Sequence, residues 1–350
     1  YEIGNRDIDD SDGGTSFVAD NCYEYWKTML QECNDKEKEN MFQWFQDHQE
    51  NYVIDYLEDY IRDFLLNEFH DEEMLHKKLH MLDEKIAKFQ KENYSGDSYS
   101  VYYGMVNNIT ARIRLMEELN YSKQEIKEYR QKYRNFSEIR KMEIQEDLVD
   151  RKYEEAIAVL KESKKMDADK TRLVAEYSQQ LIQIYEKRNM QKEYAQELQY
   201  QVFECMQRDL EYIVKLKKLY SETEWEEQRK RFLQGKTSSW IRYEFLVEEE
   251  LFEELLREIQ KNQSVYVLDQ YEKVLKKHLP NEVRDMYVQY VKSGAVRTSD
   301  RKAYKHLISY LKKITKYPNG KKIGQDIAKS WRQDYKRRPA MMDELRKAGF

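Results

Sequence analysis

The chain has few residues that interrupt helices. It contains 3 prolines and 10 glycines in 350 residues, and the first proline is Pro280. Proline removes a backbone donor and glycine adds conformational freedom, so their scarcity favours helices joined by short polar turns. Pro280, Pro318 and Pro339 each stand where a helix could begin, a position that tolerates proline. Gly294 and Asn319-Gly320 are predicted to mark turns.

Cysteines and long apolar runs are also scarce. Cys22, Cys33 and Cys205 cannot all pair and lack the spacing of a metal site, which is typical of a reducing compartment and predicts a cytoplasmic protein. No apolar run approaches the roughly 18 residues of a membrane span, and no signal peptide opens the chain. No membrane association is therefore expected. The first residue is Tyr1, so we expect a piece of a longer protein.

Tyrosine and charged residues are abundant instead. The 29 Tyr, 12 Phe and 5 Trp provide enough apolar surface that the charged fraction of 36% does not indicate disorder. The length exceeds that of a usual single core, so two packed units or one extended array are expected.

Apolar residues recur with the helical spacing i, i+3, i+4, i+7 in several stretches, and strand-like alternation is absent from the sequence. The clearest stretches run from Val53 to Leu65, from Tyr102 to Met116, from Leu173 to Tyr185 and from Tyr304 to Ile314. The sequence therefore predicts an all-α fold.

The segment from Tyr153 to Ser163 indicates how the helices pack. A bulky ring is followed three residues later by Ala156, then by Leu160 and the small Ser163, which allows close contact with a preceding helix. This pattern resembles the second helix of a tetratricopeptide repeat, although Ala168 stands where that repeat favours proline. No strict period continues along the chain. We therefore expect an irregular α-solenoid of stacked helical hairpins, tetratricopeptide-like in its middle.

Charge and breakers divide the chain into three predicted regions: an acidic leader loop over 1–15, a helical-repeat array over 16–293 and a basic helical cap over 294–350. Residues 1–100 hold roughly 10 basic and 25 acidic residues, about −15, whereas residues 301–350 hold roughly 15 and 4, about +11. The two ends could therefore attract each other, recruit differently charged partners or drive head-to-tail association.

The basic cap supplies the candidate contacts for a phosphate backbone or an acidic protein partner. Tyr317, Trp331 and Tyr335 are interleaved with the basic residues and could stack on bases. Helical spacing also places several of these rings on packing faces, so both interpretations stay open: rings that stack on bases and rings that pack inside the protein. The candidate contact residues are Lys312, Lys313, Lys316, Lys321, Lys322, Lys336, Arg337 and Arg338.

Metal and catalytic sites are not indicated. The acidic loop 7–12 could hold calcium, but its ligand positions do not match an EF-hand, and a helix-capping turn is preferred. His76 and His80, near His70, share a helical face but lack the glutamate base of a metalloprotease. The three cysteines are expected to be buried apolar residues, and no phosphate loop or nucleophile elbow occurs. No enzymatic activity and no cofactor are expected.

Several segments together resemble the C-terminal region of bacterial SWIM zinc-finger family proteins. They are Asp9 to Thr15, Ala19 to Trp26, Tyr153 to Ser163, Thr298 to Lys302 and Arg337 to Leu345, in that order. The resemblance implies that a zinc module with Cys-x-Cys and Cys-x-His ligand pairs precedes this region. Neither pair occurs here, so no zinc ligand is carried over to this chain.

The sequence thus predicts a non-catalytic helical-repeat scaffold for protein–protein interaction, within a larger SWIM zinc-finger protein. The alternative is an accessory region that binds nucleic acid through the basic C-terminal cluster. Salt dependence separates the two, since phosphate contacts release counterions.

Overall fold

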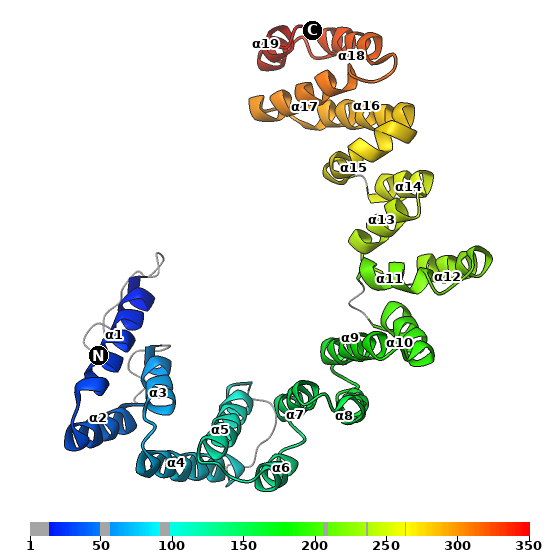
Figure 1. Ribbon diagram of the computed structural model, residues 1–350. Helices are drawn as coiled ribbons and strands as arrows, with labels where there is room; N and C mark the ends of the chain where they lie inside the picture. Colours follow the sequence, from blue (N-terminus) through cyan, green and yellow to red (C-terminus); the bar gives the residue numbers. More distant parts are fainter. Residues whose placement is uncertain (1–13, 50–56, 92–98, 206–208, 236, 263) are drawn as a thin grey trace. The chain divides into compact units, whose positions relative to one another are not determined.

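The computed structural model describes residues 14–49, 57–91, 99–205, 209–235, 237–262 and 264–350 (Figure 1). These residues form nineteen helices, and no strand occurs among them. The predicted all-α fold is confirmed. None of the helices within the described ranges combines the length and apolar character needed to cross a membrane.

The chain divides into two compact units, an N-terminal unit Tyr1–Lys170 and a C-terminal unit Thr171–Phe350. The helices of the N-terminal unit are α1 (Gly14–Glu32), α2 (Asp35–His48), α3 (Leu57–Glu68), α4 (Glu72–Lys91), α5 (Tyr99–Glu118), α6 (Lys123–Lys132), α7 (Ser137–Val149) and α8 (Tyr153–Met166). Those of the C-terminal unit are α9 (Thr171–Lys187), α10 (Gln191–Phe203), α11 (Leu210–Lys217), α12 (Glu222–Gln234), α13 (Ser239–Glu248), α14 (Phe252–Asn262), α15 (Val265–His278), α16 (Pro280–Arg297), α17 (Arg301–Ile314), α18 (Gly320–Asp334) and α19 (Pro339–Lys347).

Within each unit, a helix packs mainly on the next helix in the chain or on the next but one. The most extensive contacts join α4 to α5, α7 to α8, α9 to α10 and α16 to α17, and further contacts join alternate helices such as α1 and α3 (Figure 1). This pattern is that of stacked helical hairpins, so the predicted solenoid arrangement agrees with the observed packing.

Local capping explains where several helices begin. Asn34, Ser122 and Ser221 cap α2, α6 and α12, and each forms a capping box with a glutamate three residues later. Pro280 and Pro339 occupy the first helical positions of α16 and α19, as predicted. Pro318 lies just outside α18, whose N-cap is Asn319.

The prediction that glycines mark turns is correct at Gly320 and wrong at Gly294. Gly320 does follow a turn, in which Asn319 has a φ of 56°. Gly294 does not mark a turn, because α16 continues through it to Arg297. A Cβ atom at Gly294 would lie 2.6 Å from Leu307 Cδ2, so glycine permits close packing of α16 on α17. The predicted domain boundaries stay predictions, and the one after 293 falls within α16.

The apolar faces predicted from periodicity form the cores. Ile61, Phe64 and Leu65 are buried in α3, where Phe64 stacks on Phe45 with a centroid distance of 4.5 Å. Val53 and Tyr56, from the same predicted stretch, lie outside the described residues. The C-terminal unit has its own core, which runs from α13 to α19.

Close packing of α8 follows from its small side chains. Ala156, Leu160 and Ser163 are fully buried. The Ser163 hydroxyl oxygen accepts a hydrogen bond of 2.9 Å from Nε of Arg140 on α7. The tetratricopeptide-like spacing thus corresponds to a tight contact between two successive helices.

Candidate functional site

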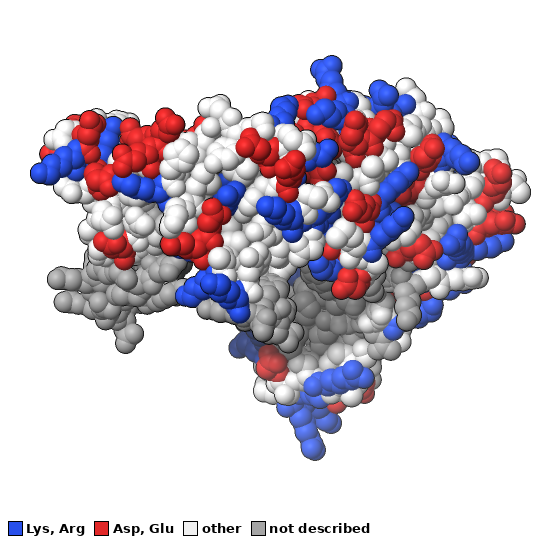
Figure 2. Space-filling model, turned by 90° about the horizontal axis from the view of Figure 1, so that it is seen from below, with Lys and Arg blue, Asp and Glu red and all other residues white. Residues whose placement is uncertain are grey.

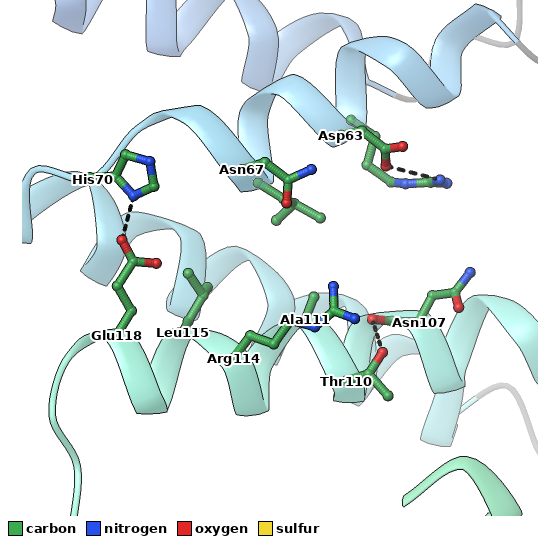
Figure 3. A pocket seen from close by; sticks show the side chains of 11 residues that line it. Asp63, Asn67, His70, Asn107, Thr110, Ala111, Arg114, Leu115 and Glu118 are labelled. Atoms are coloured by element: carbon green, nitrogen blue, oxygen red, sulfur yellow. Dashed lines mark hydrogen bonds and ion pairs between the residues drawn. The ribbon is translucent and has the colours of Figure 1, made fainter. Parts of the chain in front are cut away.

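The N-terminal unit has a groove between α3 and α5 (Figure 3). Its origin is the division of α5 into two faces. One face carries Val106, Ile109 and Ile113, which are buried in the core. Asn107, Thr110, Arg114 and Glu118 follow one another at helical spacing on the groove side of the helix. The apolar face fixes the helix against the core and thereby leaves the polar face open.

Helix α3 supplies the opposite wall. Asp63, Asn67 and His70 face the groove from α3 and the turn after it. His70 Nδ1 lies 2.5 Å from Glu118 Oε1, and Asp63 lies opposite the Asn107 end of α5 (Figure 3). The two helices therefore run in the same direction, joined by α4. This arrangement gives the groove two parallel helical walls.

The groove has a volume of about 520 Å³. Leu66, Ala111 and Leu115 add a small apolar lining to its polar walls. Ligand sites in proteins commonly measure about 300–1,000 Å³ and combine apolar lining with a few placed polar groups. The groove therefore has the size of a binding site, with a lining that is more polar than is common.

Three of the charged side chains at the groove, Arg62, Asp63 and Glu118, have partners within the chain. Arg62 lies 2.9 Å from Asp59 and 3.5 Å from Asp63, and Glu118 is paired with His70. Arg114 differs, because it has no hydrogen-bond or ion-pair partner among the described residues. Arg114 therefore places a guanidinium at the middle of the groove that no described residue pairs with.

The side-chain amides and the hydroxyl at the groove have different roles. The single proton of the Thr110 hydroxyl is shared between the Val106 and Asn107 carbonyl oxygens of its own helix, at 3.0 Å each. It is thereby committed to the backbone. The Asn107 amide has no partner among the described residues, so both its donor and its acceptor can meet a ligand.

The predicted basic cluster of the C-terminal unit is divided by the structure. Lys313 forms ion pairs of 2.6 Å with Asp269 and 2.7 Å with Glu272. Arg338 donates to the Ala295 and Thr298 carbonyl oxygens at 2.6 and 3.0 Å. These two cations therefore stabilise the fold. The other six residues are exposed: Lys312, Lys316, Lys321, Lys322, Lys336 and Arg337.

The exposed six do not form one patch. Four lie around the turn between α17 and α18, whereas Lys336 and Arg337 follow the other end of α18. Since α18 has 15 residues, its ends lie about 22 Å apart. The idea that Tyr317 and Trp331 stack on bases is wrong, because both rings are buried in the core.

The other residues that the sequence analysis weighed as metal ligands are not brought together. His76 and His80 are exposed, and His80 lies 3.7 Å from Glu84. Within the described ranges, no group of three or more His, Cys, Asp or Glu is placed to hold a metal ion. Cys205 is buried and Cys22 and Cys33 are partly buried, none of them in a disulfide. The acidic loop 7–12 lies outside the described residues.

Surface charge is mixed on the face shown in Figure 2, where Lys and Arg side chains are interspersed with Asp and Glu over the described surface. Such a surface is typical of solvated helices with local ion pairs. Attraction of a charged partner would therefore depend on individual groups such as Arg114, which is unpaired among the described residues, and not on a continuous charged surface.

Comparison with protein-family models, with curated proteins and with solved structures finds no match to this chain. The fold and the candidate groove therefore rest on the chain's own residues and geometry.

Proposed function

We propose that this chain is a non-catalytic helical-repeat scaffold that binds a protein partner by holding an extended peptide segment in the α3–α5 groove. The observation that carries the proposal is the pair of exposed polar groups, Asn107 and Arg114, which have no partner among the described residues and stand on a groove wall formed by one helical face. Groups of this kind are available to a ligand without breaking any contact in the protein.

The length of the groove suits a short peptide. From Asn107 to Glu118 the α5 wall advances 11 residues, or about 16 Å. An extended chain rises about 3.3 Å per residue, so about five peptide residues span this distance. A side-chain amide offers one acceptor and two donors, which complement the carbonyl and N–H of a peptide group.

The lining residues support binding rather than catalysis. They include no Ser, Cys, Lys or Tyr, and the one hydroxyl, on Thr110, is bonded to its own helix. The imidazole of His70 meets Glu118 and not a nucleophile. Nucleophilic catalysis needs a base within hydrogen-bond reach of an activatable group.

The cellular setting of the proposal comes from the sequence resemblance. In a SWIM zinc-finger protein of the cytoplasm, this chain would extend the contact surface beyond that of the zinc module. The partner would then be shared between the two regions.

The test is selection of random heptapeptides, displayed on phage, against the full immobilised chain. We expect a consensus whose synthetic peptides bind the wild type and bind Asn107→Trp at least tenfold more weakly, because the exposed position lets the indole fill the groove. Lys88→Trp places the same ring on α4 outside the groove and serves as the control. Absence of any consensus, or equal binding to both variants, would overturn the proposal.

A second candidate function is nucleic-acid contact through the turn between α17 and α18. It is favoured by Lys312, Lys316, Lys321 and Lys322, which are exposed and lack ion-pair partners among the described residues. Fluorescence anisotropy with labelled single- and double-stranded DNA and RNA, titrated across salt, measures this binding. Reversal of these four lysines to glutamate should abolish it at every salt concentration. Binding that persists in the variant would exclude this turn as the contact.

A further inference from the structure

We infer that the peptide segment bound in the α3–α5 groove carries a single acidic side chain, which Arg114 binds; this inference rests on the proposed function. The first support is charge compensation. Arg62 is neutralised by Asp59 and Asp63, and Glu118 meets His70. Arg114 alone among the charged groove residues has no partner within the described part of the chain.

The position of Arg114 is the second support. Figure 3 shows Arg114 on α5 between Asn107 and Glu118, across from Asn67 on α3. A guanidinium stays charged at all physiological pH values and binds a carboxylate through two parallel hydrogen bonds. An acidic side chain is therefore the ligand group that best matches the middle of the groove.

The spacing along α5 sets the expected motif. Asn107 lies seven residues before Arg114, about 10 Å along the helix, which corresponds to about three residues of an extended peptide. The amide of Asn107 would bind the peptide backbone. The carboxylate would then come about three residues away.

Charges at the two ends of the groove limit the number of acidic residues. Asp63 and Asp59 lie towards one end and Glu118 lies at the other. A run of acidic residues would place further carboxylates beside these, and like charges repel. The geometry thus favours one acidic residue flanked by neutral ones and disfavours a polyacidic tract.

The test uses the full chain and a positional-scanning library of heptapeptides, acetylated and amidated so that their termini carry no charge. At the central position we expect Glu to bind about tenfold more tightly than Gln, the effect of one charge-assisted pair at an open site. Arg114→Ala should abolish this difference, and Arg114→Glu should reverse it in favour of Lys. Lys88→Ala and Lys88→Glu remove or reverse an exposed cation on α4 and should leave it unchanged.

The outcomes separate the two proposals. Equal binding of Glu and Gln peptides that still depend on Asn107 would overturn the acidic specificity and leave the scaffold standing. A preference for Glu that survives in Arg114→Ala would show that another group binds the carboxylate. Tighter binding of peptides with three adjacent acidic residues would overturn the single-residue motif. Absence of binding by every peptide would remove the proposed function together with the inference.

Discussion

Replacing Arg140 by alanine should unfold the N-terminal unit at a markedly lower temperature. The Arg140 side chain is completely buried, and its guanidinium donates to Ser163, to the Arg134 carbonyl oxygen and to the Asp167 carboxylate. The Asp167 side chain is itself only 3% exposed. Removing Arg140 therefore leaves the Asp167 carboxylate buried without the guanidinium that balances its charge.

The expected loss can be worked out from this geometry. Breaking a buried ion pair by removing one partner costs about 3–5 kcal/mol. Lys170 still lies 3.0 Å from the other Asp167 oxygen, so the lower end, about 3 kcal/mol, is expected. For a domain of this size, that corresponds to a Tm lower by about 6–12 °C.

Scanning calorimetry of the full chain measures the effect, with a double-mutant cycle to isolate the pair. Asp167→Ala alone should also destabilise, and the double variant should be little worse than Arg140→Ala. Lys123→Ala removes an ion pair in which the lysine is 82% exposed and should change stability by less than about 0.5 kcal/mol. A loss below about 1 kcal/mol for Arg140→Ala, or simple additivity in the cycle, would refute the reasoning.

Three further predictions concern stability. Gly320→Ala should cost the C-terminal unit more than about 2 kcal/mol in calorimetry, because the new Cβ atom would lie 1.9 Å from the Ile314 carbonyl oxygen. Lys78→Met should cost about 1–3 kcal/mol in urea unfolding, because two carbonyl oxygens at the end of α3 lose the buried ammonium group. Burial and the nearby Glu138 raise the pKa of Tyr102 to about 12. The stability that this phenol contributes is present below pH 10 and is lost as the pH rises to 12, so the alkaline decrease should be smaller in Tyr102→Phe.

Matched controls accompany these three variants. Gly324→Ala, whose new atom would meet the Thr315 methyl group at 3.2 Å, should be milder than Gly320→Ala. Lys88→Met should be neutral, since Lys88 is exposed. Tyr25→Phe removes the hydroxyl of a ring that is 68% exposed and is the control for the loss of a tyrosine hydroxyl. Equal effects of a variant and its control would contradict the corresponding structural reason.

Helical periodicity predicted the buried face of the helices in which it was recognised. In α17, Tyr304, Leu307, Ile308 and Leu311 are all buried, as their spacing indicates. This success has a local cause. The position of a side chain around a helix follows from the helix geometry, and one apolar stripe identifies the buried face.

Buried charges and packing glycines could not be predicted in this way. In the sequence, Lys78 and Arg140 look like exposed charged residues. Their burial depends on carbonyl oxygens and a carboxylate that other parts of the fold contribute, and the local pattern does not show these partners. From the sequence, Gly294 suggests a turn. A glycine is needed there because the side chain of Leu307 packs against it, and Leu307 belongs to the next helix. Tertiary contacts decided all three positions.

The candidate groove was hidden for a related reason. The sequence shows the apolar stripe of α5 clearly, and the polar stripe with Asn107 and Arg114 then looks like an ordinary solvated face. Only the placement of α3 beside it makes a groove. The basic cluster shows the converse, since residues that are close in sequence, such as Lys322 and Lys336, lie at opposite ends of α18.

Hydrogen–deuterium exchange of the full chain, with and without a heptapeptide selected on it, tests most directly whether the α3–α5 groove is the binding site. We expect the peptide to slow amide exchange within residues 62–70 and 107–118, with no change in α18, and Asn107→Trp to remove the protection. Protection confined to other helices, or exchange that the peptide does not alter, would contradict a binding role for the groove.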